Sequence, residues 1–121
     1  MATTRRQKRL GELLKEELGT LLLREVRDPR LAGVTVTSVE ISPDLGHARV
    51  YISLIGDQTE KTDALNALNH AGGFLRRQIA HRLDLRHVPR FTFHFDEAIE
   101  RGQHILDILH QIEGESEGQE T

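Results

Sequence analysis

Residues 65–83 read LNALNHAGGFLRRQIAHRL. The residues at both ends of this stretch predict a helix, yet two adjacent glycines, Gly72 and Gly73, lie in its middle. Each glycine costs about 1 kcal/mol against alanine in a helix interior. We therefore predict two helical segments that meet at a kink, with backbone N–H groups exposed at the start of the second segment. Such N–H groups, with the positive end of a helix dipole behind them and arginines in the next turns, favour binding of a phosphate chain.

The distribution of charge also favours an anionic partner. The chain has 121 residues, of which 37% are hydrophobic, and this size suits one globular domain. Its net charge is −3. Residues 96–121 hold eight acidic residues and one basic residue, whereas residues 1–95 hold 15 basic and 11 acidic residues. The main part of the domain therefore carries a net charge of +4 beside an acidic end.

Several function classes are disfavoured by what the sequence lacks. The chain has no cysteine, which excludes disulfides, thiolate metal sites and cysteine nucleophiles. Its seven histidines include no His-Glu-x-x-His pair, and no phosphate loop of the Gly-x-x-x-x-Gly-Lys type is present. We therefore expect no metal, no cofactor, no small-molecule substrate and no enzymatic activity. No segment reaches the ~20 apolar residues of a membrane span, so we expect a cytoplasmic, monomeric protein without a membrane partner.

Hydrophobic spacing predicts the remaining elements. Apolar residues recur three and four positions apart from Leu10 to Val26, which predicts an amphipathic helix that begins at a Thr4–Gln7 capping box and ends before Asp28-Pro29. Residues 34–41 predict a strand with a bulge near Thr37-Ser38, and residues 48–54 alternate as its hairpin partner. Residues 91–95 predict a third strand, and residues 96–112 a weaker helix.

These elements predict an α+β domain of order α-β-β-α-kink-α-β-α, with helices on one face of a three-stranded sheet. We expect this domain to span residues 1–112. Residues 113–121 lack apolar side chains and are predicted to form a disordered acidic tail. The three phenylalanines of residues 91–95 are expected to fill the core, because the chain offers few other aromatic side chains.

Six short blocks in this order carry a family resemblance. They are Asp28-Pro29-Arg30, Ser42 with Asp44-Leu45, Ala48-Arg49-Val50-Tyr51, Ala71-Gly72-Gly73-Phe74-Leu75-Arg76, Leu85-Arg86-His87-Val88-Pro89, and Phe93 with Asp96. Together they resemble the ribosome-binding factor A family, bacterial assembly factors of the small ribosomal subunit with a type II KH-like fold. In that family an Ala-x-Gly kink takes the place of the Gly-x-x-Gly loop of ordinary KH domains. Ala71-Gly72-Gly73 matches that kink, whereas Arg90-Phe91 departs from the acidic residue and leucine that are usual there.

The resemblance implies a non-enzymatic factor that binds the free 30S subunit and its 16S rRNA. It further implies a role in late maturation and 16S rRNA processing, with contact near the 5′-terminal helix. The residues expected to contact RNA are Ala71, Gly72, Gly73, Arg76, Arg77, Arg82, Arg86 and Arg90. Three alternatives stay open: the glycines serve close packing, the arginines form an ordinary solvated face, or the protein is a protein-binding adaptor without RNA contact.

Overall fold

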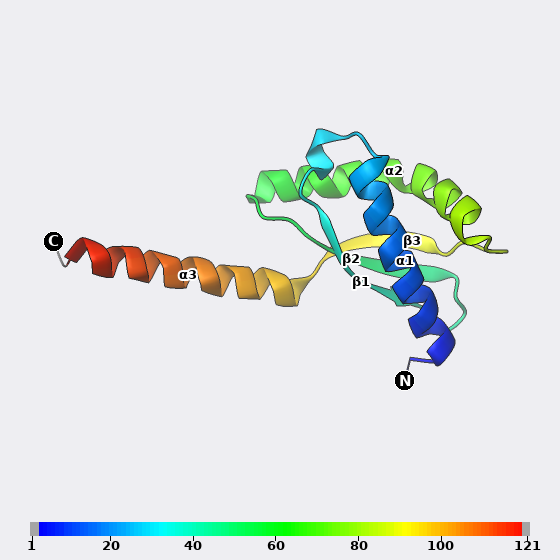
Figure 1. The fold of residues 1–121 in the computed structure, drawn as a ribbon, viewed down its shortest axis with the longest axis horizontal. Helices are drawn as coiled ribbons and strands as arrows, with labels where there is room; N and C mark the ends of the chain where they lie inside the picture. The colour runs from blue at the N-terminus through cyan, green and yellow to red at the C-terminus, as the bar shows by residue number, and fades with distance from the viewer. Residues whose placement is uncertain (1–2, 120–121) are drawn as a thin grey trace.

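The computed structural model describes the backbone of residues 3–119 and the side chains of residues 3–114. Its elements, in chain order, are α1 (Arg5–Arg24), the 3-10 turn η1 (Pro29–Leu31), β1 (Thr35–Ile41), β2 (His47–Ser53), α2 (Gln58–Leu83), β3 (Arg90–Phe95) and α3 (Glu97–Gln119). This confirms the α+β class. Figure 1 shows α1 and α2 beside the sheet and α3 projecting away from it, so two of the three helices, not all, cover the sheet.

The sheet has the order β1-β2-β3, with β1 and β2 antiparallel and β2 and β3 parallel. The predicted bulge is confirmed, because the register shifts between Val36 and Ser38. The residue between them, Thr37, donates its hydroxyl to Asp96 Oδ2 over 2.8 Å. The bulge therefore connects the edge strand β1 to the residue that precedes α3.

The core lies between the sheet and the first two helices. Ala48, Val50 and Ile52 of β2 are fully buried, and the intervening residues of that strand face the other side. Phe93 is buried, and Phe91 and Phe95 pack against the core. The phenylalanines are thus core residues, as expected, and they form no stacking platform for bases. Each large apolar side chain buried in this way stabilises the fold by about 1.5–3 kcal/mol.

The first half of α1 is held tightly against β1. The Thr4–Gln7 capping box is present, and the buried Gln7 side chain donates from Nε2 to the Ile41 carbonyl over 2.8 Å. At Gly11, an added Cβ would lie 2.6 Å from the carbonyl oxygen of Val39. Glycine is therefore the residue that allows this close approach of helix to strand.

The second helix N-terminus predicted at the glycine pair is absent. α2 is one α-helix from Gln58 to Leu83, and neither Gly72 nor Gly73 has the positive φ that Gly33 shows. The second half of α2 slopes away from the first in Figure 1, so the helix bends without a new N-terminus. The physical reason is burial on both sides of the glycines, from Leu68 to Leu75, which offsets a cost of about 1 kcal/mol per glycine.

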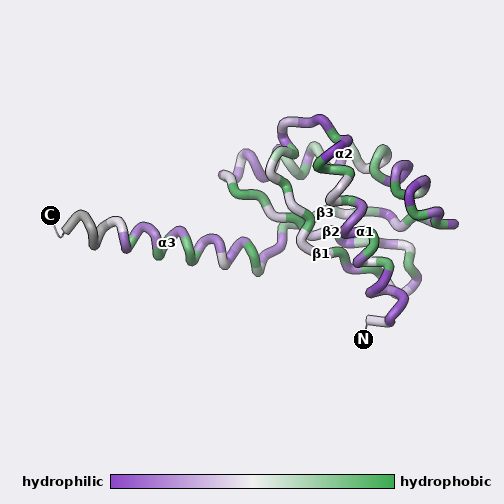
Figure 2. Tube along the Cα trace, viewed as in Figure 1, coloured by the Kyte–Doolittle hydropathy of each residue, from purple (hydrophilic) through white to green (hydrophobic). Residues whose placement is uncertain are grey.

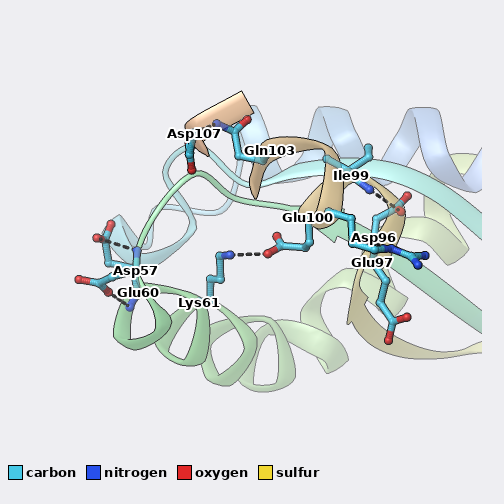
Figure 3. A network of polar contacts seen from close by, with 10 residues as sticks. Asp57, Glu60, Lys61, Asp96, Glu97, Ile99, Glu100, Gln103 and Asp107 are labelled. Carbon is cyan, nitrogen blue, oxygen red and sulfur yellow. Dashed lines mark hydrogen bonds and ion pairs between the residues drawn. The ribbon is translucent and has the colours of Figure 1, made fainter. Parts of the chain in front are cut away.

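Hydrogen bonds and an ion pair attach α3 to the domain near its first turns. Asp96 accepts hydrogen bonds from Ala98 N at 3.1 Å and Ile99 N at 3.3 Å, and Glu100 pairs with Lys61 of α2 (Figure 3). The Thr37 hydroxyl, and next the Ile99 N–H, hold the pKa of Asp96 below its ordinary value. Its carboxylate is therefore charged and able to cap the helix dipole at neutral pH.

Farther along, residues 104–114 of α3 are all exposed, with apolar and polar residues alternating along the helix (Figure 2). It continues as a helix to Gln119, through most of the segment 113–121 for which we predicted disorder. Residues 120–121 lie outside the described residues, and a domain boundary at residue 112 stays a prediction. In the described part of the chain, no helix is long and apolar enough to span a membrane.

Candidate nucleic-acid interface

Three of the predicted arginines contact, belong to or directly follow the loop between α2 and β3, residues 84–89. Arg76 of α2 donates from Nη2 to the Val88 carbonyl over 3.1 Å, and Arg86 belongs to the loop itself. Arg90 begins β3, where its N–H donates to the Gly46 carbonyl over 2.9 Å. With Arg77 next to Arg76 on α2, four exposed arginines lie on or beside this loop, and we call them the basic surface: Arg76, Arg77, Arg86 and Arg90. None of the four has an ion pair within the described residues.

The glycine pair leaves one side of α2 uncovered. An added Cβ would meet nothing within 4 Å at Gly72, and at Gly73 it would meet Arg77 Nη1 at 3.5 Å. Ala71, by contrast, is half-buried and packs against the core. The close-packing alternative for the glycines is therefore unsupported, because no neighbouring element approaches either of them. They leave the helix surface beside Arg77 without side chains of their own.

Arg82 differs from the other predicted arginines. Its guanidinium pairs with Glu25, and Nη1 lies 3.7 Å from Glu17 Oε2. Both carboxylates belong to the α1 region, so Arg82 connects the two helices. Its charge is engaged within the protein, which sets it apart from the basic surface.

A groove beside this surface contains arginines that the sequence reasoning missed. It has a volume of about 580 Å³ and lies between α1, the β1–β2 turn and the α2–β3 loop. We call it the basic groove, and its lining residues are Arg6, Arg9, Leu10, Leu13, Asp44, Leu45, Gly46, Leu85, Arg86 and His87. The missed signal was the i, i+3 spacing of Arg6 with Arg9 and of Leu10 with Leu13, which places these pairs on adjoining strips of one helix.

The acidic residue of the groove is held by the turn. The Ser42 hydroxyl donates to Asp44 Oδ1 over 2.6 Å, and Gly46 N donates to the same oxygen over 2.9 Å. These two bonds, the Ser42 bond first, lower the pKa of Asp44. Asp44 therefore stays ionised at neutral pH, and the groove carries this one carboxylate beside three guanidinium groups.

The neighbouring polar residues do not form a catalytic arrangement. The Ser42 hydroxyl points its proton at Asp44, and the His47 ring lies 3.0 Å from the Thr92 hydroxyl rather than at Ser42. His47 contributes its backbone N–H to Ser42 Oγ, which closes the hairpin turn. No cluster of three or more metal-ligating side chains was found among the described residues.

Comparison with known proteins identifies the family of the chain. The family model described as ribosome-binding factor A matches residues 6–109. The ribosome-binding factor A of Desulfitobacterium hafniense is 46% identical over 115 residues, which cover 95% of this chain and 92% of that protein.

Solved structures give the same result. The crystal structure of ribosome-binding factor A from Thermus thermophilus has a TM-score of 0.67 and 30% identity, covering 74% of this chain and 93% of that one. A homology model of the Thermus thermophilus protein has been fitted into a cryo-EM map of its complex with the 30S subunit. It has a TM-score of 0.65 and 31% identity, and the match covers 75% of this chain and 96% of that one. These relatives have a KH-like fold, which confirms the expected fold. The chain belongs to the ribosome-binding factor A family.

Proposed function

We propose that this chain is a ribosome assembly factor that binds the free 30S subunit through its 16S rRNA. It assists late maturation and processing of that RNA, with contacts near the 5′-terminal helix, in the cytoplasm. Family membership and the 30S complex of the Thermus thermophilus relative support this proposal. The observation that carries it is the basic surface, four exposed arginines of which none has an ion pair in the described part of the chain.

The mode of binding follows from what the surface offers. Guanidinium groups bind phosphate oxygens and position a protein on RNA without reading its sequence. Since the phenylalanines of β3 are in the core, base stacking on them is excluded, and binding at the basic surface rests on phosphates and shape. A basic domain of this kind holds an rRNA segment in an immature arrangement and leaves when the folded subunit offers fewer phosphates. Because the family is one of binding factors, we assign no catalytic step.

A salt titration distinguishes this function from that of a protein-binding adaptor. We expect the affinity for a 16S rRNA fragment containing the 5′-terminal helix to fall with salt, with a log–log slope of about −3 if each arginine of the basic surface contacts one phosphate. The measurement is fluorescence anisotropy of labelled RNA over a series of salt concentrations. An adaptor would give no binding to isolated RNA and a 30S association that salt leaves unchanged, and either result would contradict the proposal.

The glycine pair predicts opposite effects on stability and on binding. Gly72→Ala/Gly73→Ala should stabilise the domain by about 0.4–1 kcal/mol per site, because both positions are helical and uncrowded. The same double variant should bind RNA more weakly, because two methyl groups then cover the backbone beside Arg77. Thermal unfolding and anisotropy measure the two effects separately. A double variant that is more stable and binds equally well would remove Gly72 and Gly73 from the proposed site.

A further inference from the structure

We infer that the basic groove holds one unpaired nucleotide of the RNA, with its base on the apolar floor and its adjacent phosphates on the arginines. This inference rests on the proposed function and extends it, because it assigns a base-binding site to residues of α1 and of the β1–β2 turn. The groove therefore binds single-stranded RNA, and its contacts add to the phosphate contacts of the basic surface.

The floor of the groove is apolar and accessible. Leu10 and Leu13 of α1 face it from one side, and Leu45 and Leu85 line it from the turn and the α2–β3 loop. Leu13 is 43% exposed although it lies on the helix that packs against the sheet. A base that lies on such a floor removes apolar surface from water, and the guanidinium groups and His87 at its edge offer planes for stacking.

The charge of the groove selects an anionic occupant. Arg6, Arg9 and Arg86 have no ion pairs among the residues that the structure describes, and the carboxylate of Asp44 is engaged by Ser42 and Gly46. A purely apolar peptide would cover the floor but leave three guanidinium groups without partners. A nucleotide supplies both an apolar face for the leucines and phosphates for the arginines, so it contacts both kinds of lining residue.

The walls of the groove are held in place before any ligand binds. The Gln7–Ile41 hydrogen bond and the close approach at Gly11 fix α1 against β1. The Arg90–Gly46 hydrogen bond fixes the turn against β3. A preformed site loses little conformational freedom on binding, which favours affinity for a small group such as one base.

The groove is continuous with the basic surface, because Arg86 belongs to both and Arg76 donates to the carbonyl of Val88 in the same loop. An RNA strand whose phosphates follow the basic surface therefore reaches the groove without leaving the protein. A base inside a duplex is stacked and paired and cannot lie on the floor. The groove accordingly favours RNA that is single-stranded at this point.

The test compares a single-stranded oligoadenylate of about eight nucleotides with the same strand carrying abasic central nucleotides, which keeps the phosphates. The unchanged protein should bind the complete strand at least about fivefold more tightly. Leu13→Ser should remove that preference and leave the salt slope unchanged. Arg9→Gln should reduce the magnitude of the slope by about 0.7, because one phosphate contact is lost.

Matched controls exist on the same helix. Leu23 is 82% exposed outside the groove, so Leu23→Ser should behave like the unchanged protein. Lys8 lies on the side of α1 that faces β1, so Lys8→Gln should leave the slope unchanged. Thermal unfolding of all four variants verifies that each is folded.

Three results would overturn the inference. Equal binding of complete and abasic strands by the unchanged protein would exclude a base site. A Leu13→Ser variant that binds RNA normally but loses 30S association would indicate a protein partner in the groove. If Leu13→Ser and Arg9→Gln keep full RNA binding while charge reversal at Arg76 and Arg77 abolishes it, this inference fails and the proposed function stands.

Discussion

Reversal of Arg76 and Arg77 to glutamate is expected to abolish association with the 30S subunit while the fold stays intact. Both side chains are exposed, and the interaction lost within the protein is the hydrogen bond from Arg76 to the Val88 carbonyl, worth about 1 kcal/mol. Two guanidinium groups that neutralise phosphates become two carboxylates that repel them, which should weaken binding by about two orders of magnitude or more. Co-sedimentation with free 30S subunits at moderate salt measures the loss.

The control for this variant is Lys15→Glu/Arg101→Glu, which changes the net charge of the chain by the same amount. Lys15 faces β1 and Arg101 lies on α3, so both are outside the basic surface and the basic groove. This control should co-sediment like the unchanged protein. If Arg76→Glu/Arg77→Glu is folded and still co-sediments, or if the control also fails, the effect does not come from the basic surface.

Substitution of Gly11 by alanine is expected to destabilise the protein by about 1–2 kcal/mol, a loss of several degrees in melting temperature. The new methyl group would be 2.6 Å from the Val39 carbonyl oxygen, a backbone atom that cannot move without shifting β1 or α1. Overpacking destabilises by about 1–3 kcal/mol, and the better helix propensity of alanine offsets up to about 1 kcal/mol of this destabilisation. Thermal or denaturant unfolding measures the difference.

Gly19 provides the matched control, because it lies on the same helix and an added Cβ there would meet nothing within 4 Å. Gly19→Ala should therefore stabilise the protein by about 0.4–1 kcal/mol. Opposite signs at the two glycines would show that the contact with Val39, and not helix propensity, decides the effect at Gly11. A stabilising Gly11→Ala would mean that α1 lies farther from β1 than the structure shows.

Features that depend on neighbours in sequence were predicted well. The Thr4–Gln7 cap needs two side chains three residues apart, and the bulge at Thr37 follows from a shift in the alternation of apolar residues. The burial of Phe93 followed from the scarcity of other aromatic side chains. The cap and the bulge are decided by residues within a few positions of one another. The burial of Phe93 follows from the overall composition.

Features that depend on contacts distant in sequence were predicted poorly. The cost of Gly72 and Gly73 was recognised, but the buried residues on both sides that keep α2 continuous become visible only once the helix is packed. The pairing of Arg82 with Glu17 and Glu25 and the meeting of Arg9 with Arg86 around one groove are likewise tertiary. Sequence spacing could place these arginines on helices or loops, but it could not indicate their partners.

The outward course of α3 separates the negative charge of that helix from the positive charge of the basic surface. In Figure 1 the α2–β3 loop lies at the end of the molecule opposite α3, so most of the acidic residues of 96–121 are far from the basic surface. Charges more than about 8 Å apart in exposed positions are largely screened at physiological ionic strength, so the helix does little to repel RNA bound at that surface. In the field of a large polyanion, such a molecule turns its basic end forward before contact. Although the net charge of the chain is −3, this orientation turns the proposed RNA-binding surface toward the polyanion.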